Sequence, residues 1–367
     1  MKTNYISARN IGCMITLMIN SSQLMTGFSS VKQDLWAAVG AAIIMSAPLI
    51  VIVIRILNLN PGKDLYDIIY GNFGKVTSWI MTLLLSWYAL SVSSLVTRNF
   101  SEFVSTISLE KTPGIIIIVG MLLTAGYLAG SNFKIIGRWS LVSLIVVGFV
   151  LLLTLVFSIE IMDFDYLKPV LKEHSFSEVV SSGFTFGMIA FAETVIAMTA
   201  FGDMKPGDKP IKAYGAGVGM GAFIVMAATL RNILVLGREM LEYTIFPSYV
   251  ATRVIRMGNF FEHLESVIAF IMILMGITKS AICLRASAVG VKKLFNLKVS
   301  IKHIVIFLVA AASIFSTVTF SNMHEMMSFA DMYRYYAISF TVVIPIMIWI
   351  KSEIKNRKNN KNIAVQL

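Results

Sequence analysis

The chain has 367 residues, of which 57% are hydrophobic and only 14% are charged, whereas roughly a quarter of the residues of a soluble globular protein are charged. This composition excludes an ordinary soluble enzyme or binding domain. The net charge of +11 would suit a nucleic-acid-binding protein, but the placement of the basic residues described below explains it without nucleic acid.

Long apolar segments follow one another along the whole chain. A helix needs roughly 17 to 25 apolar residues to cross a bilayer, and only helices or closed barrels satisfy their backbone in lipid. Continuous apolar runs lack the alternation of a barrel, so they predict an all-α integral membrane protein of about ten spans. Runs free of Asp, Glu, Lys and Arg are Asn10 to Val31, Trp36 to Ile54, Val76 to Thr97, Pro113 to Phe133, Trp139 to Ile159 and Ile304 to Met323. Segments with a few charges lie near 183–202, 211–236, 263–284 and 332–350.

The basic residues predict the orientation of these spans. On a ten-span assignment, 21 of the 31 lysines and arginines fall on the side of the two termini, which the positive-inside rule places in the cytoplasm. Residues 351–367 then form a basic cytoplasmic tail of a single membrane domain that covers 1–367. Cys13 and Cys283 fall within spans and are interpreted as small packing residues.

A polar connection near 160–180 divides five spans from five. Because five is odd, the second half enters the membrane with the opposite orientation, which is typical of the 5+5 inverted-repeat, leucine-transporter-like fold. We expect repeats over 1–158 and 184–350, with the first helix of each repeat broken at mid-membrane.

Both of these helices contain polar residues at the expected depth. Span one has Asn20, Ser21, Ser22 and Gln23 in succession, and span six has Glu193 in an apolar segment. Such groups are costly in lipid unless they face a cavity or a broken backbone, although small and hydroxyl residues also serve helix packing. The glycines at 215, 217, 219 and 221 lack the spacing of a dinucleotide loop and predict close helix packing instead.

Three short motifs resemble the spore germination permease family, the B subunits of endospore germinant receptors, which is similar to amino acid/polyamine/organocation permeases. The segment from Ser29 to Trp36, SSVKQDLW, resembles the family's GQDAW. The segment from Thr97 to Phe103, TRNFSEF, resembles RxFxEF, and Phe191-Ala192-Glu193 resembles FGE. The chain departs from the family in lacking a proline after the break of span one and in having Ala192 where glycine is usual.

The resemblance implies a nutrient sensor that works in the spore inner membrane with companion A- and C-type receptor subunits. Exposed N–H and C=O groups at broken helices suit the two charged groups of an amino acid, which is therefore the preferred ligand. A proton-coupled amino acid transporter is the alternative, and a structural subunit or ion channel is a third reading. No catalytic constellation, cofactor motif or metal-ligand cluster is visible, so we expect no enzyme, no cofactor and no bound metal.

Fold position selects the candidate ligand-binding residues, which are Asn20, Ser21, Ser22, Gln23, Tyr88, Ser91, Phe186, Gly187, Ala190, Phe191, Glu193 and Thr278. Glu193 could bind a ligand ammonium, carry a proton or act as a hydrogen-bonded structural carboxyl. Lys279 could pair with Glu193 or with a ligand carboxylate, but a lysine near a helix end more often extends to the membrane interface. Arg98 and Glu102 lie one turn apart and predict a local ion pair or a subunit contact.

Overall fold

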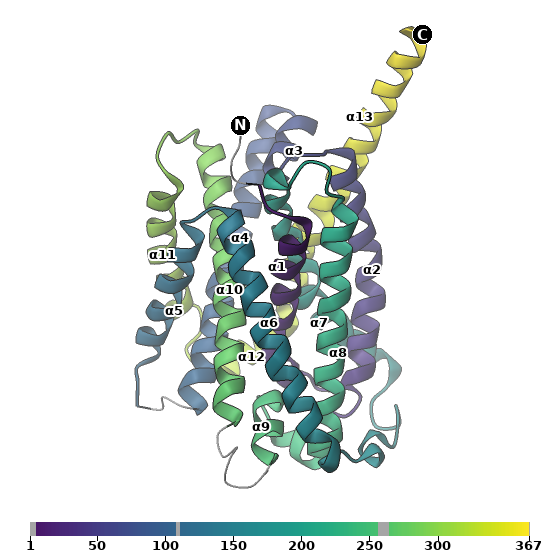
Figure 1. The fold of residues 1–367 in the computed structure, drawn as a ribbon, viewed down its shortest axis with the longest axis vertical. Coiled ribbons are helices and arrows are strands. Elements are labelled where there is room, and N and C mark those ends of the chain that lie inside the picture. The colour runs from purple at the N-terminus through teal and green to yellow at the C-terminus, as the bar shows by residue number, and fades with distance from the viewer. Residues whose placement is uncertain (1–4, 108–110, 256–263, 367) are drawn as a thin grey trace.

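The computed structural model describes residues 5–107, 111–255 and 264–366, and the regular elements in these ranges are helical (Figure 1). In the first half they are α1 (Ala8–Asn20), η1 (Ser21–Phe28), α2 (Leu35–Leu59), α3 (Leu65–Asn72), α4 (Lys75–Ile107), α5 (Gly114–Ala129), α6 (Phe133–Ser158), η2 (Ile159–Ile161) and η3 (Phe164–Leu167). In the second half they are α7 (Phe176–Ala190), η4 (Ala192–Asp203), α8 (Pro210–Tyr243), α9 (Pro247–Val254), α10 (Leu264–Leu294), α11 (Ile301–Val318), α12 (Met323–Ile338), η6 (Ser339–Val343) and α13 (Ile344–Gln366).

Eight helical segments within the described ranges are long and apolar enough to cross a membrane. The remaining two of the expected ten are α1 with η1, which is divided, and α5, which is short. Both run alongside the other helices in the bundle, but the count of ten stays a prediction. The first residue of the expected 263–284 span lies outside the described residues.

Polar residues between the apolar runs set where several helices begin. The side chains of Ser7, Asp64, Asn132 and Asn322 accept hydrogen bonds from backbone N–H groups in the first turn of the helix that follows each of them. Ser175 does the same for α7, and Glu178 bonds back to the Ser175 backbone in a capping box. These caps satisfy N–H groups that have no partner within a helix.

Helix α1 lies in the middle of the bundle and is buried from Asn10 to Asn20 (Figure 1). It packs closely on α8 because glycines face each other: a Cβ on Gly217 would lie 2.7 Å from the Gly12 carbonyl oxygen. Gly221 is packed in the same way against Ile19, whereas a Cβ on Gly219 would meet nothing. The predicted packing role is therefore confirmed at two of the four glycines of α8.

The helix type changes at both places where the repeat predicts a break. The α-helix of span one ends at Asn20 and continues as the 3₁₀ helix η1, and α7 ends at Ala190 before the 3₁₀ helix η4. A 3₁₀ stretch within a membrane helix changes which carbonyls are bonded inside the helix. The chain stays helical across both points, so a full discontinuity stays a prediction.

The chain before α1 is attached to the end of η4. The Ile6 N–H donates to the Asp203 carbonyl at 2.8 Å, and the Lys205 N–H donates to the Ile6 carbonyl at 2.9 Å. The Ala8 N–H also donates to Asp208 Oδ2 at 2.8 Å. These bonds join the first helices of the two halves at the end of the bundle where both termini lie (Figure 1).

The connection near 160–175 lies at the opposite end of the bundle. It is anchored by the buried Asp34 side chain, which accepts from the Leu171 N–H at 3.0 Å and contacts His174 Nδ1 at 3.1 Å. Helix α7 already begins at Phe176, before the expected repeat boundary at 184. The expected tail from 351 continues α13 as a helix.

Candidate ligand-binding site

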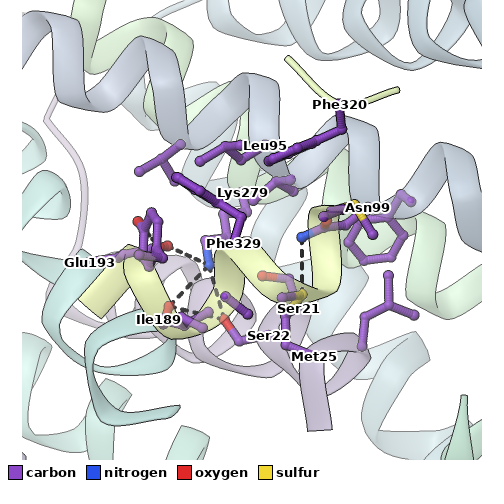
Figure 2. Close-up of a pocket in the computed structure, with 17 residues that line it drawn as sticks. Ser21, Ser22, Met25, Leu95, Asn99, Ile189, Glu193, Lys279, Phe320 and Phe329 are labelled. Atoms are coloured by element: carbon purple, nitrogen blue, oxygen red, sulfur yellow. Dashed lines mark hydrogen bonds and ion pairs between the residues drawn. The ribbon is translucent and has the colours of Figure 1, made fainter. Parts of the chain in front are cut away.

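A small cavity of about 50 Å³ lies where η1 and η4 meet α4, α10 and α12 (Figure 2). Its polar lining consists of Ser21, Ser22, Asn99, Glu193, Lys279 and Tyr333. The rest of the wall is apolar and consists of Leu24, Met25, Val92, Leu95, Val96, Phe100, Ile189, Phe320, Met326, Phe329 and Ala330. The cavity therefore combines a few polar groups with an apolar wall, as small-molecule sites do.

An ion pair stands at the centre of the polar side of the cavity. Lys279 Nζ lies 2.7 Å from Glu193 Oε2, and the two residues are only 1% and 3% exposed. The expectation that Lys279 extends to the membrane interface is wrong, because its ammonium is held inside the bundle. Burial of a charge in a low-dielectric interior is costly unless a close opposite charge offsets it, and Glu193 provides that charge for Lys279.

The two changes of helix type supply the other partners of the lysine. Lys279 Nζ donates to Ser22 Oγ at 2.9 Å and to the Ile189 carbonyl at 3.4 Å, and Ser22 Oγ donates to the same carbonyl at 3.2 Å. Figure 2 shows these contacts converging on the ammonium. The Ile189 carbonyl lies in the last turn of α7, where carbonyl groups have no N–H partner within the helix. It can therefore accept hydrogen bonds from the lysine and the serine.

A chain of hydroxyl groups holds the other oxygen of the carboxylate. Tyr333 Oη donates to Glu193 Oε1 and is 3.0 Å from Tyr88 Oη. The Tyr88 ring stacks on Phe340 with centroids 4.7 Å apart. Within the described residues, Glu193 Oε2 has no aligned hydrogen-bond donor in addition to its ion pair. This oxygen keeps the capacity to accept a hydrogen bond from a bound molecule.

A wider vestibule of about 540 Å³ adjoins the cavity on the side away from the termini. Met25, Ile189 and Ala330 line both spaces and thus form the partition between them. The vestibule is rich in hydroxyl groups, and its charged residues are Glu178, Asp331 and Arg334. A polar molecule can therefore approach the partition along groups that form hydrogen bonds.

The structure brings Ser21, Ser22 and Glu193, of the twelve residues expected from the sequence, to the cavity wall. Asn20 and Gln23 are buried next to it but bond to each other at 2.8 Å, and Asn20 also donates to the Thr16 carbonyl. These two amides stabilise the change of helix type. They do not line the cavity.

The other expected residues lie around the site. Tyr88 reaches it through Tyr333, whereas Ser91 bonds to Tyr336 Oη at 2.9 Å and lines a shallow groove near Phe315. Phe186 lines the vestibule and packs edge-on against Phe191.

Three expected residues serve helix packing. Gly187 allows close contact with Ser46 of α2, and Ala190 is buried without lining either space. Thr278 accepts a hydrogen bond from Trp139 Nε1 at 3.0 Å and is directed away from the cavity.

Sequence reasoning missed the wall that α12 provides. Phe329, Ala330 and Tyr333 line the cavity from this helix, which begins at Met323 although the apolar run predicts a span only from 332. The signal was an aromatic residue every three or four positions, at 329, 333 and 336, beside charged residues. A helix with one aromatic face and one polar face gives weak hydropathy, so the expected span near 332–350 does not include residues 323–331.

Some residues of the three motifs that resemble the family line the cavity, and the others hold neighbouring segments together. Glu193 and Phe100 line the cavity, whereas Gln33 donates to the Tyr166 carbonyl at 3.2 Å and anchors the 160–175 connection with Asp34. Arg98 and Glu102 form the predicted local ion pair at 2.7 Å.

Replacing Tyr333 with Phe is expected to destabilise the protein by about 1–3 kcal/mol, because a buried carboxylate oxygen loses its donor. The ring and its packing would remain. Thermal unfolding of the purified protein in one detergent measures the effect. Tyr336→Phe is the matched control, since the half-buried Tyr336 bonds to the neutral hydroxyl of Ser91 and not to a carboxylate, and its loss should cost less. Equal stability of Tyr333→Phe and wild type would contradict the role given to the hydroxyl.

Comparison with known sequences links the chain to one family. The sequence model described as "Spore germination protein" matches residues 5–326. Spore germination protein KB of Bacillus subtilis (strain 168) is 24% identical over 370 residues, which cover 97% of each chain. Spore germination protein A2 of the same strain is 24% identical over 308 residues, 81% of this chain and 80% of that relative.

Solved structures of transporters share the fold. Mhp1, a nucleobase-cation-symport-1 family transporter with bromovinylhydantoin bound, has a TM-score of 0.65 at 11% identity, covering 92% of this chain and 78% of that one. MhsT in complex with L-phenylalanine has a TM-score of 0.63 at 12% identity, covering 93% and 87%. The manganese transporter of Eremococcus coleocola has a TM-score of 0.63 at 12% identity, covering 95% and 84%. The chain thus has the leucine-transporter-like fold predicted from the division into two halves.

Proposed function

Because the chain belongs to the spore germination protein family, we propose that it is a permease-like, nutrient-sensing subunit of a spore germinant receptor. It binds a small zwitterion, with amino acids as the preferred class, between Glu193 and Lys279 and thereby triggers germination. The protein is a multi-pass membrane protein related to permeases, and its structural neighbours are transporters rather than enzymes.

The buried ion pair is the observation that supports a zwitterionic ligand. An amino acid that enters between the two side chains gives its ammonium to Glu193 and its carboxylate to Lys279. One ion pair is then replaced by two, with no change in the net charge of the site. A ligand with a single charge would instead leave one side chain buried without a partner, which is strongly unfavourable.

The size of the cavity supports a sensing mechanism with two arrangements. A volume of about 50 Å³ is below the several hundred Å³ that small-molecule pockets commonly have. The ligand must therefore separate Lys279 from Glu193 and move the partition at Met25, Ile189 and Ala330. A ligand that binds only the expanded arrangement shifts the population toward it, and that shift is the signal.

The proposed setting is the spore inner membrane, with both termini in the cytoplasm and with A- and C-type companion subunits. Support comes from the relatives, which are named spore germination proteins, and from the excess of basic residues on the side of the termini.

A proton-coupled amino acid transporter is the second candidate, and one observation favours it. Glu193, Tyr333 and Tyr88 form a continuous chain of groups that can pass a proton. Uptake of radiolabelled amino acids into proteoliposomes separates the candidates, because a sensor binds without turnover whereas a transporter accumulates its substrate along a proton gradient.

Ligand analogues test the proposal directly. The full-length protein in lipid nanodiscs would be screened with the twenty amino acids by thermal shift. Any amino acid that binds would then be compared with its decarboxylated amine and its deaminated acid. Each analogue is expected to bind at least about tenfold more weakly, because it leaves Lys279 or Glu193 unpaired. An amine or acid that binds as tightly as the amino acid would contradict the zwitterion site.

A further inference from the structure

A second buried cation lies far from the cavity, on α8. Arg231 is only 2% exposed and is positioned toward the end of the membrane-spanning part of α8 that is distant from the termini. Unlike Lys279, it has no carboxylate partner among the residues that the structure describes. A buried charge of this kind is expensive in a membrane protein and is usually matched by an opposite charge.

Neutral groups accept hydrogen bonds from most of the N–H groups of Arg231, but they do not neutralise its positive charge. Nη1 donates to Thr154 Oγ1 at 2.7 Å, Nη2 donates to Asn232 Oδ1 at 2.7 Å and to the Ser248 carbonyl at 3.3 Å, and Nε donates to Asn232 Oδ1 at 3.3 Å. A guanidinium has five N–H groups, so one on Nη1 is still available. These contacts also fix the orientation of the guanidinium, which lowers the entropy cost of binding an anion.

An apolar groove of about 150 Å³ ends at this arginine. It lies between α6, which contributes Gly148 and three leucines, and the part of α8 from Phe223 to Arg231. Phe223 and Arg231 are eight positions apart, which corresponds to about 12 Å of helix. Phe223 and Leu152 at the groove are 70% and 59% exposed on helices that cross the membrane, so the groove opens toward the lipid.

We propose that this groove binds an anionic phospholipid, with the headgroup phosphate on Arg231 and one acyl chain along α6 and α8. The positive charge without a carboxylate selects an anion, and the apolar groove beside it selects a hydrocarbon chain. A free inorganic anion would use the arginine but leave the groove unexplained. The inference depends only on the membrane-embedded fold and is independent of the proposed germinant site.

Two variants separate the contributions of charge and groove. Arg231→Gln removes the positive charge and keeps a polar side chain, whereas Gly148→Leu fills the groove and leaves Arg231 in place. A Cβ on Gly148 would meet no atom within 4 Å, so this variant should fold. Gly120→Leu is the matched control, because a Cβ there is equally unobstructed and Gly120 lies on α5, outside the groove.

Native mass spectrometry of the full-length protein from mixed nanodiscs measures the bound lipid. The wild type and Gly120→Leu are expected to retain one phosphatidylglycerol with about fivefold preference over phosphatidylcholine, the ratio that one basic side chain near the membrane surface provides. Arg231→Gln and Gly148→Leu should each lose the preference. Phosphatidylglycerol should also raise the unfolding temperature, relative to phosphatidylcholine, more for the wild type and Gly120→Leu than for Arg231→Gln and Gly148→Leu.

Three outcomes would overturn the proposal. The wild type could show no preference for phosphatidylglycerol, or Gly148→Leu could retain it fully. Inorganic phosphate could also stabilise the wild type in phosphatidylcholine as well as phosphatidylglycerol does, which would assign Arg231 to a small anion in place of a lipid.

Discussion

Replacing Glu193 with Gln is expected to destabilise the protein by about 3–5 kcal/mol, because it leaves the Lys279 ammonium buried without its carboxylate. Lys279→Met should also destabilise it, since the carboxylate then loses its cation. The double variant Glu193→Gln/Lys279→Met removes both charges and should recover most of the lost stability. Thermal unfolding of the four proteins in one detergent gives the coupling between the two sites.

The same variants separate the structural role of the pair from its role in ligand binding. In a strain that lacks the native chain, the double variant is expected to reach a normal protein level but to give no germination response to the amino acid that binds the wild type. A normal response would show that the ion pair only holds the bundle together. Strictly additive losses of stability in the single and double variants would contradict the pairing itself.

Replacing Gly27 with Ala is expected to disrupt the packing of η1, because a Cβ there would lie 1.7 Å from the Ile245 carbonyl oxygen and 3.0 Å from Pro247. Backbone atoms cannot rotate away, so η1 or the segment before α9 must shift. Overpacking of this kind costs about 1–3 kcal/mol or more. Since η1 also carries Ser21 and Ser22, ligand binding should weaken together with thermal stability.

Gly120→Ala is the control for this prediction. A Cβ at Gly120 would meet no atom within 4 Å, and alanine favours a helix over glycine by about 1 kcal/mol. This variant should therefore unfold at the wild-type temperature or slightly above it. Equal behaviour of Gly27→Ala and Gly120→Ala would show that η1 is not held against the segment at 245–247.

The two positions where an α-helix changes to a 3₁₀ helix could be predicted from the sequence, because the prediction needs only the polarity of each segment and the number of spans that precede it. Four polar residues at 20–23 and a carboxylate at 193 are incompatible with lipid, and an odd number of spans before the 160–180 connection inverts the second half. The charge of Glu193 also selected it as a candidate ligand-binding residue, and the structure places it on the cavity wall. In contrast, Thr278 and Gly187 were selected by fold position, and both serve helix packing in the structure.

Local rules could not decide the direction of long side chains. On the span expected over 263–284, Lys279 lies close enough to one end for its side chain to reach the interface. In the structure α10 continues to Leu294, so Lys279 lies at the middle of the helix, and η4 beside α10 provides Glu193 as its partner. Tyr333 was missed for a related reason, because its hydroxyl acquires a role only through a carboxylate that is 140 residues distant in the sequence.

The amino-acid sequence is sufficient to predict the membrane-spanning class, the division into two halves and the polar residues that lipid cannot surround, because the cost of exposing charges and backbone to hydrocarbon applies to each segment separately. The packing of the helices is needed to establish which opposite charges meet, which amides support the helix ends, and that α12 closes the cavity. The interaction energy of two charged side chains depends on the distance between them, and the hydropathy of the sequence does not give the distances between helices.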